Sequence, residues 1–255
     1  MPKKLKAPVV RLTSSPTIKV TVSVVAVIAL AATTGGAHAA DLAAGSGRAQ
    51  AEAVLERYVS GSGTAPWPVE SVEIHASLPK LAKSGQLEAI RRTDQSEGLT
   101  YHVVQVSGDR TVKDQVIVRY LNAQQRAWQM QPAAVAFTPA NYKFAYKGMV
   151  DVEGGFAYAF RITPRKKRIG LIKGELWLDG ESALAIRHSG YFVKSPSLWI
   201  KRIAVTQQDA LRDGDVQFRL THIAIETRVV GRAELTIAER PLGRAEKKQP
   251  IASSF

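Results

Sequence analysis

The chain has 255 residues, a formal net charge of +13 and no cysteine. The missing cysteines exclude disulfide bonds, thiolate metal sites and lipid attachment at a lipobox, so the apolar core must supply the stability of the fold. A chain of this length suits one domain with a sizeable core.

The N-terminal segment has the pattern of a secretory signal peptide. Cations precede an apolar run from Val20 to Ala32, and Ala37-His38-Ala39 supplies the small residues that signal peptidase requires. The run is shorter than the about 20 residues of a membrane span. We therefore expect residues 1–39 to be cleaved and the mature chain to be periplasmic, with an uncleaved N-terminal anchor as the alternative.

Cleavage would lower the positive charge without abolishing it. Residues 1–39 hold five of the 35 Lys and Arg and none of the 22 Asp and Glu, which leaves a net charge of +8. Such an excess favours anionic partners. An exported protein seldom meets nucleic acid, so we expect lipid or an anionic membrane surface and no nucleic acid.

Residues 44–60 are predicted to form an amphipathic helix, because their apolar side chains recur at helical spacing. The helix should end at "GSGTAPWP", where Gly and Pro stop it, and Trp67 should pack back onto the core. Short strands are then predicted around residues 72–76, 87–92 and 101–106, separated by the turn signals "SLPKLAKSG" and "TDQSEG".

A second helix is predicted over residues 111–129. Thr111 and Asp114 have the spacing of a capping box, and Ile117, Tyr120 and Leu121 fall on one helical face. The alternative is a strand through "QVIVRY", which its β-branched residues favour.

From Tyr142 onward the chain alternates apolar and polar residues in seven segments, the pattern of a β-meander. In residues 155–162 the large apolar side chains share one face of the predicted strand. The polar residues 213–215 read as a hairpin turn rather than a calcium loop. The tail, residues 243–255, lacks periodicity, and we expect it to be disordered.

Four cations, Arg165, Lys166, Lys167 and Arg168, follow Pro164 between two predicted strands. Proline cannot donate to a strand ladder, so this cluster should lie at a connection. It is interpreted either as a solvated turn whose charges discourage edge aggregation or as a contact for anionic headgroups or an acidic partner.

The region from Tyr142 to Glu239 resembles the periplasmic lipoprotein-carrier superfamily, which comprises LolA-like and LolB-like carriers and the related sensing domain of sigma-factor regulators. In that group a strand ends in a basic, Pro-containing turn, a Leu-Trp-Leu-Asp strand follows, and an Arg-x-x-Gly strand comes next. The matching residues are Phe160, Pro164, Lys166, Leu176, Trp177, Leu178, Asp179, Arg187 and Gly190.

The resemblance implies an α+β fold: a strongly curved antiparallel sheet, or incomplete β-barrel, with two helices covering its open side. Residues 44–60 and 112–127 would be these helices within one LolA/LolB-like domain over residues 40–242. The concave side would take acyl chains, and a sheet too wide for its own side chains leaves an apolar cavity. The candidates for its lining are Phe156, Tyr158, Phe160, Trp177 and Trp199.

Enzyme motifs are absent from the sequence, and the histidines lie in separate predicted strands, so no catalytic residue, metal site or cofactor is predicted. His222 and Glu226 would face the same side of a strand about 13 Å apart, too far to touch. We therefore predict a non-enzymatic envelope protein that carries or senses a lipid, a lipoprotein acyl chain or another apolar ligand. The alternative is a scaffold or sensor for envelope proteins whose sheet interior is filled.

Overall fold

The computed structural model describes residues 37–61, 67–94, 98–129, 132–229 and 231–242. The predicted tail lies outside these residues, as does the predicted signal peptide apart from its last three positions.

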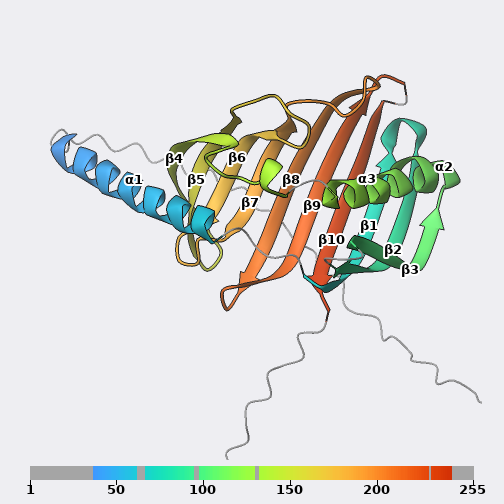
Figure 1. Ribbon diagram of the computed structural model, residues 1–255, viewed down its shortest axis with the longest axis horizontal. Coiled ribbons are helices and arrows are strands. Elements are labelled where there is room, and N and C mark those ends of the chain that lie inside the picture. The colour runs from blue at the N-terminus through green and yellow to red at the C-terminus, as the bar shows by residue number, and fades with distance from the viewer. Residues whose placement is uncertain (1–36, 62–66, 95–97, 130–131, 230, 243–255) are drawn as a thin grey trace, which may run out of the picture.

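Ten strands form one antiparallel sheet in the order β3-β2-β1-β10-β9-β8-β7-β6-β5-β4. The strands are β1 Val69–Leu78, β2 Lys83–Asp94, β3 Gly98–Gly108, β4 Tyr142–Val152, β5 Gly155–Pro164, β6 Ile172–Asp179, β7 Ala185–Phe192, β8 Ile200–Arg212, β9 Asp215–Thr227 and β10 Arg232–Pro241. The sheet curls strongly without closing into a barrel, with β3 and β4 at its edges (Figure 1). The predicted meander, the three early strands and the curved antiparallel sheet are all confirmed.

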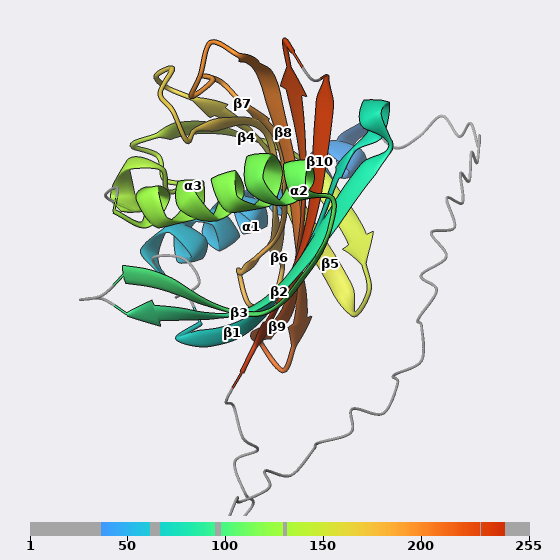
Figure 2. The same ribbon diagram turned by 90° about the vertical axis from the view of Figure 1, so that its right-hand side faces the viewer.

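Two long helical segments lie on the concave side of this sheet (Figure 2). The first, α1, spans Ala37–Ser60 and packs near β4 to β6. The second runs from Arg110 to Trp128 as α2 (Arg110–Val112), a π-helical turn (Lys113–Ile117) and α3 (Val118–Trp128), and it crosses β1 to β3. The predicted α+β architecture is therefore confirmed, and the alternative strand through residues 115–120 is wrong.

The second helical segment begins at a different cap from the one predicted. Asp109 is the N-cap, and its carboxylate accepts hydrogen bonds from the backbone N–H groups of Thr111 (2.8 Å) and Val112 (3.3 Å). The predicted capping box of Thr111 and Asp114 is wrong, because Thr111 already lies inside the first turn. Asp109 serves better because an extended N-cap residue directs its side chain at these free N–H groups.

Two separate apolar cores lie under the two helices. One packs aliphatic side chains of β1, β2 and β10 against the second helical segment, with Ile74, Ile117 and Ile237 fully buried. The other packs α1 against aromatic and aliphatic side chains of β4 to β6, including Tyr142 and Phe160. The predicted apolar face of residues 111–129 is confirmed, since Tyr120 and Leu121 pack against the first core beside Ile117.

The hairpin between β8 and β9 turns at Asp213 and Gly214, which have φ angles of 53° and 75°. Two successive positive φ angles are the mark of the tight type I′ hairpin turn, and they explain the glycine. The turn interpretation of this segment is confirmed.

Candidate ligand groove on the concave face

The middle of the concave face, across β8 and β9, carries a strip of aliphatic side chains at the margins of the two cores: Ile223 and Ile225 pack partly buried against the first, and Val205 against the second. Val205 lies opposite Ile223, and Ile223 lies opposite Leu235, which is buried in the core under α3. Residues paired across an antiparallel sheet share a face, so these side chains point to the concave side. Ile203 and Ile225 pair one step further along the same face. We call Ile203, Val205, Ile223 and Ile225 the central strip, and all four are only half-buried.

The floor beside the central strip is lowered by a pair of glycines. Gly190 of β7 lies opposite Val205 on one side and Gly174 of β6 on the other. A Cβ atom added to Gly174 would lie 1.9 Å from the Ser189 carbonyl oxygen, and one added to Gly190 would lie 2.3 Å from that of Lys173. The two strands thus approach more closely than any side chain permits, which leaves the concave floor bare at this point.

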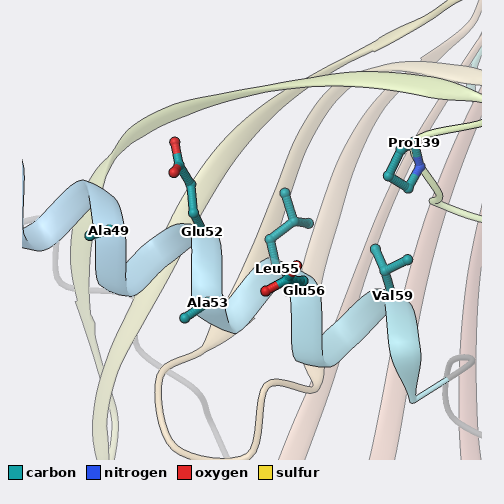
Figure 3. A pocket seen from close by; sticks show the side chains of 7 residues that line it. All are labelled: Ala49, Glu52, Ala53, Leu55, Glu56, Val59 and Pro139. Atoms are coloured by element: carbon teal, nitrogen blue, oxygen red, sulfur yellow. The ribbon is translucent and has the colours of Figure 1, made fainter.

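A groove of about 430 Å³ lies between α1 and the segment that leads into β4, a volume within the usual range of ligand pockets. Figure 3 shows Leu55 and Val59 directed toward Pro139, with Glu52 and Glu56 on the same helix. The full lining is Ala49, Glu52, Ala53, Leu55, Glu56, Val59 and Pro139. The helix that the resemblance predicts as a cover therefore forms one wall of a groove.

One end of the concave face holds a chain of buried charges, which we call the ionic belt. Its members follow one another across five strands: Arg91 (β2), Glu70 (β1), Glu239 (β10), Arg219 (β9) and Asp209 (β8). Arg91 bonds Glu70 through Nε and Glu239 through Nη1 (2.8 Å). Arg219 forms a two-pronged pair with Asp209 at 2.9 and 2.8 Å. The side chains of Glu70 and Asp209 are only 1% and 3% exposed.

The charges in the ionic belt hold each other in place. Burial opposes the positive charges of Arg91 and Arg219, but the neighbouring carboxylates outweigh it, so the pKa of each guanidinium is raised. Burial also raises the pKa of Glu70, although Arg91 works in the opposite direction. Glu70 Oε2 is buried and has no hydrogen-bond partner within the described part of the chain. Three carboxylates therefore share two guanidinium groups in the ionic belt.

Both helices present a tyrosine toward the belt. Burial raises the pKa of Tyr58 of α1 to about 12, with Tyr142 and then Asp209 adding to the effect. Burial likewise raises the pKa of Tyr120 of α3, and Glu239 adds to it. Trp67 lies under the Arg219 guanidinium, 5.2 Å from ring centroid to Cζ. The concave face is thus closed at the belt, while the central strip toward the start of β8 stays half-exposed.

His188 lies between the belt and the core under α1. Its ring is 5.3 Å from that of Phe137, between centroids. Burial lowers the pKa of His188 to about 4, with Asp209 opposing and Arg219 supporting the shift. The side chain is therefore neutral at ordinary pH. The described residues contain no cluster of three His, Asp or Glu side chains suited to a metal ion.

Three of the five predicted cavity residues lie together, and two lie elsewhere. Tyr158 and Phe160 are buried in the core under α1, and the Tyr158 hydroxyl donates to Gln50 Oε1 at 3.2 Å. Phe156 packs edge-on against Tyr158 at 5.5 Å and is 39% exposed. Trp177 alternates with the buried Leu176 and Leu178, so it points to the convex face.

On the convex face the Trp177 ring packs under the Arg187 guanidinium, at 4.7 Å. Trp199 is 67% exposed in the connection between β7 and β8. The assignment of the five residues as cavity lining stays a prediction.

The basic cluster does lie at a connection, between β5 and β6, and its two arginines have structural partners. Arg165 Nε donates to the Pro139 carbonyl oxygen at 2.6 Å, and Arg168 Nη2 donates to Asn141 Oδ1 at 2.6 Å. These bonds fix the segment that leads into β4. The side chains of Lys166 and Lys167 are exposed.

Sequence reasoning missed the ionic belt and the central strip. A signal for the belt was present: Glu70 has the same parity as Val72 and Ile74 in its strand, and Arg91 has the same parity as Leu87 and Ala89. A charge at an inward position of an amphipathic strand must find a partner across the sheet. The central strip had no such signal, because its isoleucines and valine are typical of any buried strand face.

None of the described helices is long and apolar enough to cross a membrane. No protein-family model matches the chain, and no curated protein matches it.

Solved structures do align with the chain over most of its length. A DUF1329 family protein from Desulfovibrio piger is 12% identical, covers 78% of this chain and 95% of its own, and has a TM-score of 0.37. A LolA superfamily protein from Nitrosomonas europaea is 12% identical, covers 75% and 93%, and has a TM-score of 0.31. The MucA/MucB complex of Pseudomonas aeruginosa aligns at 13% identity, with coverage of 76% and 94% and a TM-score of 0.24.

Proposed function

We propose that this chain is a non-enzymatic protein of the cell envelope, exported to the periplasm, that holds a lipid, a lipoprotein acyl chain or another apolar ligand on its concave face. The central strip carries the proposal: four aliphatic side chains on adjacent strands stay half-buried between two closed cores. Each methylene that an acyl chain buries there contributes about 0.8 kcal/mol, so a long chain binds without any specific polar contact.

The position of α1 supports the same proposal. Its buried contacts with the sheet are made mainly by the small side chains of Ala51 and Val54, with Leu55 and Tyr58 partly buried beside them. Fewer large apolar contacts oppose a shift of this helix than oppose one of the second helical segment, and a shift away from Pro139 would widen the groove beside Leu55 and Val59. The ionic belt closes the far end of the concave face, and the aliphatic strip takes the acyl chain.

A direct test is to extract lipid from protein purified gently out of an envelope fraction and to identify it by mass spectrometry. A long-chain fluorescent fatty acid then serves as the probe for affinity. Val205→Glu places a charge on the central strip and should weaken probe binding by about tenfold or more, because the charge must lose its water. Thr206→Glu is the matched control, since the next residue of a strand points to the convex face.

If no lipid co-purifies and the wild-type chain does not bind the probe, carriage is wrong. The chain would then be a scaffold or sensor for envelope proteins.

A further inference from the structure

The connections between strands carry charges of opposite sign at the two edges of the sheet where strands begin and end, which are distinct from its edge strands β3 and β4. Neighbouring antiparallel strands turn alternately at one edge and at the other. Residues 79–82, 165–171, 193–199 and 228–231 connect β1 to β2, β5 to β6, β7 to β8 and β9 to β10, and all four lie at the same edge (Figure 1). We call these four connections the basic edge.

The four connections of the basic edge contact one another in sequence along the sheet. The Val193 N–H donates to the Leu171 carbonyl oxygen at 3.0 Å, and the Arg228 N–H donates to that of Trp199 at 2.9 Å. The Lys80 side chain lies against Gly231, where an added Cβ would be 2.6 Å from Lys80 Cδ. Segments that are far apart in the sequence therefore form one continuous surface.

The four connections of this surface are cationic, and Asp109, which follows β3 at the same edge, pairs with Lys83 at 3.2 Å. The four connections contain Lys80, Arg165, Lys166, Lys167, Arg168, Lys194 and Arg228, and no Asp or Glu. The connections described at the opposite edge, residues 153–154, 180–184 and 213–214, contain Glu153, Glu181 and Asp213, and no Lys or Arg. Charge of opposite sign at the two edges orients the whole molecule in the field of a charged surface.

The basic edge also holds the most exposed large apolar side chains of the described residues. Leu198 is 90% exposed, Val229 is 75% exposed and Trp199 is 67% exposed. The Arg228 side chain donates through Nε to the Leu198 carbonyl oxygen at 2.9 Å, which holds the two connections together. Apolar side chains that a soluble protein gathers at one exposed point mark a surface for interaction.

We propose that the basic edge docks on the surface of an anionic lipid bilayer, with Leu198, Trp199 and Val229 entering the headgroup region. Tryptophan favours the membrane interface, where its ring is partly apolar and its N–H stays wet. Exposed lysines such as Lys166 and Lys167 are attracted by anionic headgroups, and this attraction adds to the insertion of apolar side chains. The combination of the two kinds of side chain favours a bilayer over an acidic protein partner.

Docking in this orientation has a consequence for the concave face. The ionic belt lies toward the acidic edge, and the Ile203 and Ile225 end of the central strip lies toward the basic edge, near the start of β8 and the end of β9. The open end of the strip would face the bilayer and its closed end would face away. The docking itself does not depend on whether the concave face binds a ligand.

The test measures sedimentation of the full chain with vesicles of phosphatidylcholine containing phosphatidylglycerol, and with phosphatidylcholine alone. We expect binding to the anionic vesicles only, and a loss that grows with added salt. Leu198→Asp with Trp199→Asp should weaken binding by about tenfold or more, since two apolar side chains no longer insert. The matched control is Val104→Asp with Met149→Asp, two similarly exposed apolar residues elsewhere on the sheet.

The charge contribution is tested separately. Lys166→Glu with Lys167→Glu should weaken binding to anionic vesicles strongly. Arg92→Glu with Arg212→Glu makes the same change in net charge near the acidic edge and should change vesicle binding by less than about twofold. Brominated lipids should quench wild-type tryptophan fluorescence more than that of Trp199→Phe.

Equal binding of all variants, which a membrane-active N-terminal segment would produce, overturns the proposal. So does equal binding to neutral vesicles. Failure of the wild-type chain to bind either vesicle also overturns it and leaves an acidic protein as the partner of this edge.

Discussion

The two helices cover the concave face in different ways. The second helical segment buries Val112, Val116 and Ile117 in an aliphatic core, and Asp109 caps its first turn. The described part of α1 buries Ala51 and Val54. Leu55 and Tyr58 pack partly buried beside them, and polar ties join the helix to the sheet: Tyr158 donates to Gln50, and Arg57 donates to the carbonyl oxygens of Gly180 and Glu181.

This difference indicates which of the two helices can move relative to the sheet. Large aliphatic side chains locked in a core resist separation, because each loses its apolar contacts at once. A helix whose fully buried side chains are small, and whose bonds from Arg57 are exposed, exchanges those bonds for water at little cost. The second helical segment is thus the fixed side of the concave face, and α1 is the side that can yield to a ligand.

The largest expected effect comes from breaking the ionic belt at the fixed side. Arg91→Met removes the guanidinium that pairs with Glu70 and Glu239 and leaves two buried carboxylates without a cation. We expect the free energy of unfolding, measured by urea denaturation, to fall by about 3–5 kcal/mol. Arg92→Met, at the exposed next position, should change it by less than about 0.5 kcal/mol.

A second comparison distinguishes lost charge pairing from lost packing at Arg91. Adding Glu70→Gln and Glu239→Gln to Arg91→Met removes the unpaired charges and should recover much of the stability. A loss of under about 1 kcal/mol for Arg91→Met alone would contradict the burial of the belt.

The next effect is a dependence of stability on pH that comes from His188. The pKa of His188 in the folded chain, about 4, lies below the ordinary value of 6.5. Between these two pH values His188 is therefore protonated in the unfolded chain and neutral in the folded chain. Stability from this group is complete above pH 6.5 and is lost as the pH falls toward 4, by at most about 3 kcal/mol. Urea denaturation between pH 7 and 4 should therefore give a shallower decline for His188→Gln than for the wild type.

His222→Gln serves as the control for that measurement, because His222 is exposed and pairs with Thr236 on the convex face. The raised pKa of Glu70 works in the opposite direction: its stabilising effect grows as the pH falls through its folded pKa. Since Glu70 is present in both variants, the difference between them isolates His188. An identical pH profile for wild type and His188→Gln would refute the assignment.

Most of the sheet could be predicted from the sequence because the alternation of apolar and polar residues within a strand shows which of its faces is buried. In β1 the buried residues alternate with exposed or half-exposed ones, as a period of two requires, and β4 and β10 show the same alternation. The start of α1 at Ala37 rather than at residue 44 was missed, since Gly45 and Gly47 argue against a helix there and propensity alone does not decide it.

The candidate site was harder to predict because it depends on pairing between distant strands. Arg91 meets Glu239, and Asp209 meets Arg219, only once the register of the sheet is fixed. The aromatic residues chosen as cavity lining were visible in the sequence, but their surroundings were not: Phe160 lies in a core, and Trp199 lies at an exposed edge. Which strand faces lie under a helix is a property of the whole fold.

The smallest expected effect tests the cap that the sequence misplaced. Asp109→Ala removes the acceptor for the N–H groups of Thr111 and Val112, so the second helical segment should fray at its start. We expect the Tm to fall by about 2–4 °C, the usual effect of losing one cap in a domain of this size. Asp114→Ala removes the carboxylate that the capping box invoked and should change the Tm by less than about 1 °C, because Asp114 makes only an exposed pair with Arg110. Equal losses for the two variants would mean that the helix begins at Thr111 after all, and that this side of the concave face is less firmly fixed than its core implies.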